Sequence, residues 1–561
     1  MIFETVAQLK LATLTAGQLV STKGYYASGD GGAADYIVAA TQAVDGYGDH
    51  ALAGGTVALL QVGTSVDVKL YGAKCDGVTE DAAAWQAALD AGVPLNFAGI
   101  SLCDNQLTSS GKPVTIAGLS MEGSELRFTS YIPARTGLNI TATNWTDFLR
   151  LKDLNITTST GWAVGKTAIR LDGSSQVTPS TLGTSGTVGI TGGRMIKRAA
   201  LDNVGIQGVV DSATTGWNNG LHVTSLGWFS VNAFTWNGDF SEWTSGNGKG
   251  TAIRIDGDGI PVEIHLSDLR IYAATHGIYC PDYVEGLYVS DFDMVNVTYG
   301  IRGQYVPGES TMLEIDTGLL QASIGPGHVS CRTGGVVLFN TNQTTVSYCN
   351  IYLQPLASDS NFFGVYLKNG GANCISDTVV TNIMSNTNAA WGVALRDVGR
   401  SFVSNISSYS MDGATVYLGG SSDHNSLNGI YGHNQNWVVI GDAGSDNNTI
   451  SDVHGITIGT ALIAVDLNNV IVKKEYSGTI VVTLTGGAAT ETVDVPIPAA
   501  YFTATPTAGF LMSSGISLLM SGFYNSDSPS STATNARFLV ASHDGTAIGG
   551  GGYRFSFLLK E

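Results

Sequence analysis

A degenerate repeat with a fixed interval constrains the fold of this chain more than any other feature. Its core reads apolar, any residue, Asp or Asn, apolar, any residue, apolar, and two clear copies centre on Asp268 and Asp291. These two copies stand 23 residues apart, and Gly277–Ile278 and Gly300–Ile301 repeat at the same interval. Further copies centre on Asp153, Asn203, Asp377, Asn405, Gly429 and Asp452. A period of this length indicates a solenoid, in which each repeat stacks on the one before it.

Short apolar strands flank each Asp or Asn and predict an all-β parallel β-helix over residues 66–470. Each coil would lie about 4.8 Å from the next, with the Asp or Asn at a corner, because short polar side chains tolerate unusual backbone angles. Several stacked β-sandwiches would explain the strands but not the fixed interval. The 65-residue interval from Asn203 to Asp268 is interpreted as one long insertion between coils.

A single short helix precedes the repeat. Val66, Val68 and Leu70 alternate with polar residues and predict a strand, and residues 82–91 (AAAWQAALDA) predict the helix. Thr79 is the expected N-cap residue of this helix. One helix in front of many strands is typical of a cap that covers the exposed end of a solenoid core.

Composition limits the partners. The 561-residue chain has a formal net charge of −19, which argues against a nucleic-acid partner and against binding to an anionic membrane. An acidic polysaccharide stays possible if basic residues gather in one groove. The six cysteines show no CxxC spacing, so we expect buried free thiols and no zinc. No metal or cofactor motif is present, and we expect no cofactor.

Two smaller modules flank the predicted β-helix. Residues 1–65 form a leading module that contains a hairpin-like segment, Gly24–Val38, with a glycine-rich turn. After residue 470 longer strands follow, and residues 471–561 predict a separate antiparallel β-sandwich.

Two stretches resemble a known family. VDVKLYGAKCDGVTEDAAAWQAALDAG, from Val66 to Gly92, is similar to the start of the pectate-lyase-like right-handed β-helix of phage tailspikes. Tyr71, Cys75 and Trp85 replace the usual Phe, Gly and Ile. GYYASGDGGAADYIV resembles tailspike head modules. The family comprises phage tailspikes and capsule or O-antigen depolymerases, which are homotrimers that cleave bacterial surface polysaccharide.

The resemblance implies a location and a set of partners. The chain would be made in the cytoplasm of the host bacterium, become part of the virion and act outside the cell at the host surface. Its partners would be a bacterial capsular or O-antigen polysaccharide, two further copies of itself, and another phage tail protein bound through the head module. The C-terminal module would serve trimerisation or carbohydrate binding.

The repeat also predicts which side chains point outward. Because Ile264 and Leu266 would face the core, His265 would face solvent, and we expect it to stack with Tyr288 and Glu314 on the next coils. Past the corner, Arg270 and Asp293 would form a neighbouring pair. Glycoside hydrolysis needs two carboxylates, and Asp293 and Glu314 are our candidates, with His265, Tyr288 and Arg270 as substrate-binding residues.

Two other carboxylates compete for the catalytic role. Glu285 lies at a predicted strand end, and Glu309 in GESTMLEI resembles the acidic residue of an EPLLxI segment found in some depolymerases, although the proline is absent.

A tryptophan-rich stretch is the expected glycan platform. Trp236 and Trp243, with Asp239 and Glu242 between and beside them, fall within the long interval after Asn203. Indole faces stack on the apolar faces of sugar rings, although packing of the loop or of a trimer interface would also explain these residues.

Three functions are compatible with this pattern. The first is a glycoside hydrolase that depolymerises the polysaccharide. The second is a polysaccharide lyase, with His265 or Tyr288 as base and Arg270 neutralising a uronate. The third is a non-catalytic adhesin on the same scaffold.

Overall fold

The structure is a computed structural model. It describes residues 1–129, 136–143, 147–161, 166–173, 199–209, 215–238, 249–256, 262–282, 284–303, 319–355, 361–383, 390–433, 435, 437–442, 444–445, 447–455, 461–464, 471–473, 475–484, 490–496, 508–513, 535–541 and 551–560. The chain divides into two compact units, Met1–Asn340 and Thr341–Glu561. None of the helices in the described residues is long and apolar enough to cross a membrane.

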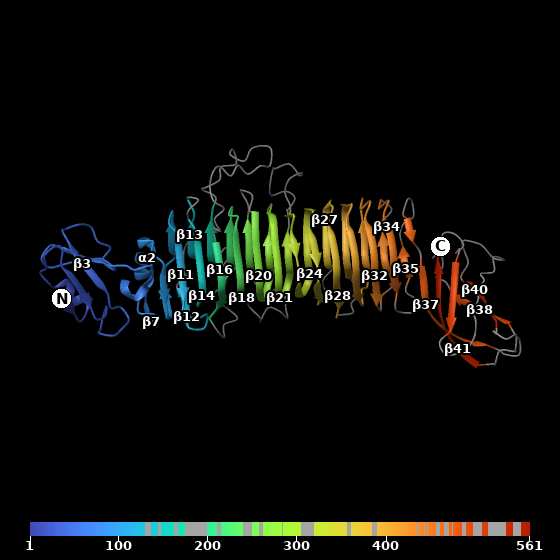
Figure 1. The fold of residues 1–561 in the computed structure, drawn as a ribbon, viewed down its shortest axis with the longest axis horizontal. Coiled ribbons are helices and arrows are strands. Elements are labelled where there is room, and N and C mark those ends of the chain that lie inside the picture. Colours follow the sequence, from blue (N-terminus) through green and yellow to red (C-terminus); the bar gives the residue numbers. More distant parts are fainter. Residues whose placement is uncertain are drawn as a thin grey trace, which may run out of the picture. The chain divides into compact units, whose positions relative to one another are not determined.

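The first unit begins with a small β-sheet module (Figure 1). Its strands lie in the order β1 (Ile2–Phe3), β2 (Leu19–Thr22), β3 (Asp35–Ala39), β5 (Val57–Leu60) and β4 (His50–Ala51), and α1 (Val6–Lys10) follows β1. β2 and β3 pair antiparallel, and the segment predicted to be hairpin-like, Gly24–Val38, supplies only the connection between them and most of β3, because β2 ends before it. Within this segment, the Asp30 carboxylate accepts hydrogen bonds from four backbone N–H groups, which hold the pKa of Asp30 below its usual value although burial alone would raise it.

The capping helix is α2 (Ala82–Ala91), with the predicted bounds. Two local predictions are wrong. The first strand, β6, ends at Asp67, because the Asp67 carboxylate caps a 3-10 turn, Val68–Tyr71, by accepting from Lys69 N at 2.9 Å. Thr79 is not the N-cap residue of α2, since it lies in β7 (Asp76–Glu80) and Asp81 precedes the helix.

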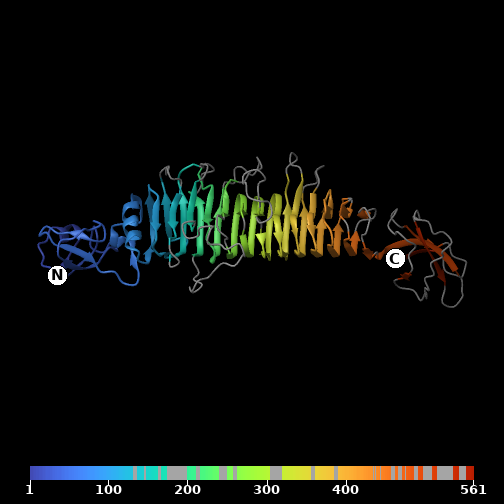
Figure 2. The same cartoon turned by 90° about the horizontal axis from the view of Figure 1, so that it is seen from above.

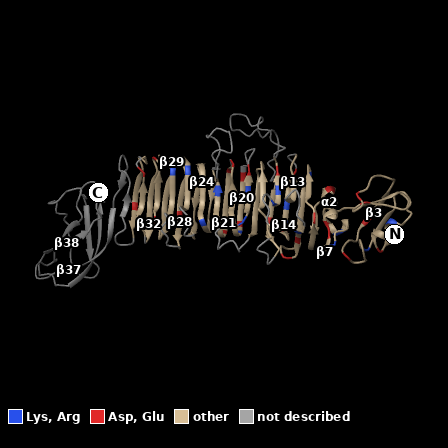
Figure 3. Cartoon of the chain, turned by 180° about the vertical axis from the view of Figure 1, so that it is seen from behind, with Lys and Arg blue, Asp and Glu red and all other residues tan. Residues whose placement is uncertain are grey.

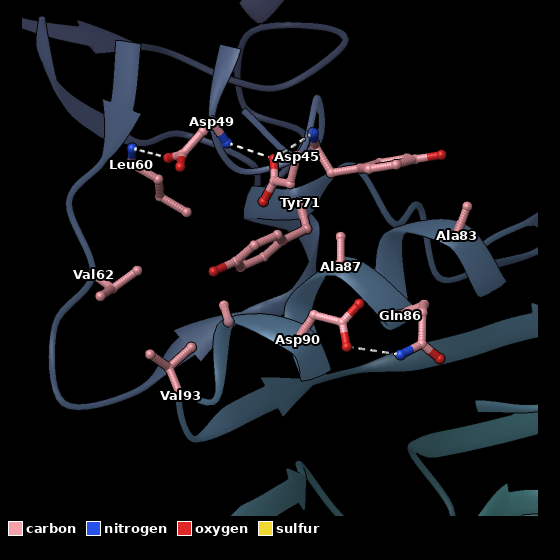
Figure 4. Close-up of a pocket in the computed structure, with 12 residues that line it drawn as sticks. Asp45, Asp49, Leu60, Val62, Tyr71, Ala83, Gln86, Ala87, Asp90 and Val93 are labelled. Carbon is pink, nitrogen blue, oxygen red and sulfur yellow. Dashed lines mark hydrogen bonds between the residues drawn. The ribbon is translucent and has the colours of Figure 1, made fainter. Parts of the chain in front are cut away.

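A cleft of about 590 Å³ lies between the head module and α2 (Figure 4). Three carboxylates line it, and each is already engaged. Asp45 accepts from the backbone N–H of Tyr47, Asp49 accepts from Leu60 N, and Asp90 accepts from the Gln86 side chain. These groups hold the loops and the helix in place.

Successive coils of a right-handed parallel β-helix follow α2 in the first unit (Figures 1 and 2). The clearest coil is β20 (Val262–Cys280), and it pairs in parallel with β21 (Val284–Gly303) at an offset of 23 residues, Ile264 with Leu287. Asp268 and Asp291 have φ of 50° and 51°, so they occupy the corner as predicted. Further corners at Glu263 and Ala273 divide the coil into three faces.

Alternation along the coil builds the core. The side chains of Ile264, Leu266 and Leu269 are at most 1% exposed and point inward, while the residues between them point outward. Burying one such side chain contributes about 1.5–3 kcal/mol, and each inward residue stacks on its counterpart one coil away. The backbone turn at the corner residue lets apolar side chains point inward again on the next face of the coil.

The interval from Asn203 to Asp268 is not one insertion. It contains a complete coil, because β16 (Ala199–Gly208) pairs with β18 (Phe229–Asn237) and β18 pairs with β20. Ala233 takes the corner position of this coil with φ of 50°. Alanine lacks the polar side chain on which the repeat was recognised, so the sequence pattern skipped this coil.

The remaining strands of the first unit belong to the same parallel architecture. They are β8 (Leu95–Phe97), β9 (Gly99–Cys103), β10 (Leu107–Ser110), β11 (Val114–Gly118), β12 (Ser124–Phe128), β13 (Thr136–Thr141), β14 (Leu149–Thr158), β15 (Thr167–Asp172), β17 (Asn219–Thr224), β19 (Thr251–Asp256), β22 (Leu319–Leu320), β23 (Ser323–Ile324) and β24 (Gly327–Asn342).

The second unit contains parallel coils with the same kind of corner. Asp377, Asn405, Gly429 and Asp452 all have φ between 48° and 66°, as the repeat predicted. Its parallel strands are β25 (Thr345–Ser347), β26 (Cys349–Leu353), β27 (Phe362–Gly371), β28 (Cys374–Asn382), β29 (Ala390–Gly399), β30 (Phe402–Tyr409), β31 (Ala414–Gly419), β32 (Ser426–His433), β33 (Trp437–Gly441), β34 (Thr449–Gly455), β35 (Ala461–Ala464) and β36 (Ile471–Lys473).

Antiparallel strands complete the second unit, as predicted for the C-terminal module. One sheet has the order β37 (Glu475–Leu484), β41 (Gly551–Lys560), β39 (Ala508–Ser513), and the other pairs β38 (Thr490–Pro496) with β40 (Asn535–Ala541).

The six cysteines are free thiols, and all but Cys374 are buried. This confirms the prediction of buried free thiols.

Candidate functional site

Outward side chains of β20 and β21 form a polar patch on two adjoining faces of the first unit. The first face carries His265 and Tyr288, which are directly paired in the sheet register. Beyond the Asp268 corner, the second face carries Arg270 and Asp293, again a direct pair. The prediction that these four side chains occupy neighbouring positions on adjacent coils is therefore confirmed.

On the first face the rings of His265 and Tyr288 stack on each other. The ring centroids of His265 and Tyr288 are 4.7 Å apart with an interplanar angle of 13°, so the rings are stacked. The His265 side chain is 58% exposed, and its Nε2 lies 3.7 Å from Glu263 Oε2. Because the rings cover each other's faces, the pair turns its ring edges to solvent, with the imidazole nitrogens and the Tyr288 hydroxyl as hydrogen-bonding groups for sugar hydroxyls.

On the second face each charged group has a partner. Arg270 lies 2.9 Å from Asp268 Oδ1 and donates to Asp291 O at 3.2 Å. Asp293 Oδ1 lies 2.7 Å from Nδ1 of His328, which belongs to β24 and is paired with Asp293 in the register. The second face thus combines a guanidinium with a carboxylate that is in contact with an imidazole.

His328 is a site residue that the sequence reasoning missed. The interval from Asp293 to His328 is 35 residues rather than 23, so the repeat gave no reason to align them. The alternation Gly327–His328–Val329 was the available signal, since Val329 is fully buried and His328 must then point outward.

The predicted place of Glu314 in the patch is wrong. Tyr288 is paired with Ser323, so the position that Glu314 was expected to take belongs to a serine nine residues further on. Glu314 itself and Glu309 lie outside the described residues. Glu285 lies near the start of β21, opposite Val262 of β20 and partly buried.

The predicted glycan platform at Trp236 is also wrong. Trp236 lies on β18, is 1% exposed, and packs against Gly220, where an added Cβ would approach its ring within 2.8 Å. It is a core residue of the coil that the repeat pattern skipped. Trp243, Asp239 and Glu242 lie outside the described residues.

A second polar cluster covers the third face of the same coils. Arg254, Tyr279 and Arg302 are paired in register on β19, β20 and β21, one above the other. The ring of His276 stacks on that of Tyr279, with centroids 4.5 Å apart, and on that of Tyr299, with centroids 5.5 Å apart. None of these five residues was singled out from the sequence.

The hydrogen bonds of His276 define its protonation state. Arg302 Nη1 lies 3.2 Å from His276 Nε2, and because a guanidinium can only donate, Nε2 must be the unprotonated acceptor. The Nδ1–H then donates to Thr251 Oγ1 at 3.3 Å. Burial, followed by the charges of Arg302 and Arg254, lowers the pKa of His276 to about 3, so the ring is neutral at physiological pH.

This lowered pKa predicts acid sensitivity. Between pH 6.5 and about 3 the unfolded chain protonates His276 and the folded chain does not, so the contribution to stability is complete above pH 6.5 and decreases as the pH falls. We expect a loss of about 1.4 kcal/mol per pH unit in this window. The measurement is thermal unfolding from pH 7 to pH 4 for wild type and His276→Phe, which keeps the stacked ring. Parallel pH profiles for the two proteins would contradict the assignment.

Beside this cluster, the Asp256 carboxylate contacts the side chains of Arg254 and His222. Its Oδ1 accepts from Arg254 Nε at 2.8 Å, and its Oδ2 lies 2.7 Å from His222 Nε2. Burial alone would raise the pKa of Asp256, but the bonds from His222 and Arg254 outweigh burial and lower it. The charge of Arg254 is therefore compensated by an ionised carboxylate.

Several solved structures of phage tailspikes resemble this chain. Full-length tailspike protein 2 from Escherichia coli O157:H7 bacteriophage CAB120 is 13% identical, with 89% of this chain and 60% of that chain covered and a TM-score of 0.46. The tailspike gp49 from Pseudomonas phage LKA1 is 12% identical, with 88% and 99% covered and a TM-score of 0.45.

A third similar structure is tailspike protein gp49 from Acinetobacter baumannii bacteriophage Fri1, a capsular polysaccharide depolymerase. It is 10% identical, with 100% of this chain and 98% of that chain covered and a TM-score of 0.38. No protein-family model matches the sequence, and no curated protein matches it. This chain spans 60% of the length of the full-length CAB120 protein.

Proposed function

We propose that this chain is a phage tailspike that binds a bacterial capsular or O-antigen polysaccharide and depolymerises it by hydrolysis. The observation that carries the proposal is the patch on β20, β21 and β24, where the stacked rings of His265 and Tyr288 adjoin the contact between Asp293 and His328. A sugar bound at the polar edge of the aromatic pair would bring a neighbouring glycosidic bond toward that carboxylate.

The chemistry follows from the two groups on the second face. Asp293 is partly exposed, so its carboxylate is available as a base or nucleophile toward a glycosidic bond, and the contact with His328 fixes its orientation. Glycoside hydrolysis requires a second carboxylate as acid, and Glu285, Glu309 and Glu314 remain the candidates for that role. Arg270 would hold substrate hydroxyl groups, since Asp268 already compensates its charge.

The decisive experiment is incubation of the purified protein with a panel of capsular and O-antigen polysaccharides. We expect a shift of one polymer to small fragments in size-exclusion chromatography. Mass spectrometry of the fragments then identifies the reaction, because hydrolysis adds one water per cleaved bond whereas a lyase leaves an unsaturated sugar. A polymer that is bound without any change in size would identify an adhesin and overturn the proposed enzyme.

We propose further that the chain assembles as a homotrimer and docks on another phage tail protein through residues 1–65. Exposed apolar side chains in the second unit support assembly, because Phe402 on β30 is 62% exposed and Ile383, directly after β28, is 49% exposed. Closed threefold symmetry would bury such a surface on every copy.

The trimer is testable by light scattering. We expect a mass of three times 58.4 kDa at micromolar concentration, and we expect Phe402→Glu to shift the mass toward the monomer by placing a charge in the buried interface. Tyr348→Glu, at a similarly exposed aromatic position between β25 and β26, measures the effect of the charge alone. A monomer mass for the wild type would contradict the proposal.

A further inference from the structure

The third face of the first unit carries an aligned series of basic and aromatic side chains. Arg254, Tyr279 and Arg302 occupy the same register position on consecutive coils, and each follows an isoleucine that is fully buried. Because neighbours in a strand point to opposite sides, all three side chains point outward. Figure 3 marks Lys and Arg in blue on the strands between the labels β13 and β29.

The two arginines of this series differ in their partners. Arg254 is bound to the carboxylate of Asp256, with contacts of 2.8 and 3.1 Å from its Nε. No carboxylate within the described part of the chain forms an ion pair with Arg302. Its hydrogen bond runs instead to the neutral His276, and its Nε is buried with no partner in the described structure.

Aromatic rings hold the Arg302 guanidinium in place. Its Cζ lies 4.4 Å from the centroid of the Tyr299 ring and 5.9 Å from that of Tyr279. The His276 ring stacks between these two tyrosines, and its Nε2 accepts a hydrogen bond from the guanidinium, so all three side chains hold Arg302. A side chain fixed in this way loses little conformational freedom when it binds a ligand.

An uncompensated guanidinium is unusual here because the chain is strongly acidic, with a formal net charge of −19. Partial burial strengthens its attraction for an anion relative to one in open water. A carboxylate matches the planar donor fork of arginine, and the hydroxyl groups of Tyr279 and Tyr299 beside it can bond sugar hydroxyls. The second face lacks this combination, since Arg270 is paired with Asp268.

We propose that the third face binds an acidic sugar, with Arg302 holding the carboxylate of a uronate and the tyrosine hydroxyl groups bonding the sugar hydroxyls. This site rests on the proposed function, because it assumes a polysaccharide ligand, and it adds that the ligand carries uronate residues. Arg254 is a positioning residue for Tyr279 and contributes little net charge, since Asp256 and Arg254 compensate each other.

The test measures binding of tetrasaccharides of galacturonate, glucuronate and mannuronate by calorimetry, each beside its carboxyl-reduced neutral form. We expect at least one uronate tetrasaccharide to bind. Its carboxyl-reduced form should bind at least tenfold more weakly. Arg302→Met should weaken uronate binding by roughly ten- to hundredfold, because it removes a charge-assisted hydrogen bond. Arg302→Lys keeps the charge but not the fork, and it should show a smaller loss.

Arg400→Met is the control, since Arg400 is an exposed arginine in the second unit, outside the proposed binding faces. We expect wild-type uronate binding for this variant. Equal affinity for acidic and reduced sugars, unchanged binding by both Arg302 variants, or no binding of any uronate would each overturn the site. The proposed cleavage is measured separately on whole polysaccharides, so a cleaved polymer together with unaffected Arg302 variants would remove this inference alone.

Discussion

Replacement of Asp293 by Asn is expected to lower the rate of polysaccharide cleavage by about a hundredfold or more. The amide has the size of the carboxylate and still accepts a hydrogen bond from His328, but it can neither take a proton nor attack a sugar carbon. Because the Asp293 side chain is 47% exposed, its replacement should leave the melting temperature nearly unchanged. The measurement is the initial rate of fragment release from the polymer that the wild type cleaves.

Asp291→Asn provides the matched control on the same coil. Asp291 is exposed and sits at the corner with φ of 51°, a conformation that asparagine also adopts readily. We expect this variant to cleave at the wild-type rate. Wild-type cleavage by Asp293→Asn would exclude the second face as the catalytic groove. Glu285, Glu309 and Glu314 would then each be replaced by Gln and tested in the same assay.

Replacement of Trp236 by Ala is expected to destabilise the first unit by about 3–5 kcal/mol. The indole is fully enclosed in the coil interior, and its removal leaves a cavity beside Gly220 that the rigid stack cannot close. Urea unfolding, followed by circular dichroism, measures the loss. Affinity for the polysaccharide should be unchanged in the protein that remains folded, because the indole has no outward surface.

Trp236→Phe distinguishes packing from hydrogen bonding at this position. The Trp236 Nε1–H is buried and has no partner among the described residues, so phenylalanine removes an unsatisfied donor while filling most of the volume. We expect a loss clearly smaller than that of Trp236→Ala. Equal losses for the two variants, or weakened glycan binding with unchanged stability, would contradict a core role.

The corners of the coils were predictable because they depend on single residues. A position with φ near 50° favours Asp, Asn or Gly, and that preference is written in the local sequence at Asp268, Asn405 and Gly429. Ala233 shows the limit of this signal, since it takes the same conformation without the side chain that marks it. One unmarked corner was enough to turn a whole coil into an apparent insertion and to move Trp236 from the core to a loop.

The site was predictable only where two coils have equal length. His265 with Tyr288 and Arg270 with Asp293 follow from the 23-residue offset between β20 and β21. On the next coil the added residues change the offset to 35, so Ser323 takes the position expected for Glu314 beside Tyr288, and His328 lies opposite Asp293. For the third face, the sequence holds a signal in the alignment of Gly277–Ile278 with Gly300–Ile301 at the same 23-residue interval. Each pair is followed by an outward residue, Tyr279 and Arg302, so this alignment predicts that the two side chains are neighbours.

By itself, the sequence determined the type of fold, the period of its coils and most of their corners. These properties are local, because alternation and backbone preference act between residues that are close in the chain. Only the tertiary structure decided which outward side chains meet, such as Asp293 with His328 and Arg302 with His276. The physical reason is that stacking aligns residues through the hydrogen-bond register between coils, and the number of residues in the connecting segments sets that register without leaving a pattern in the strands.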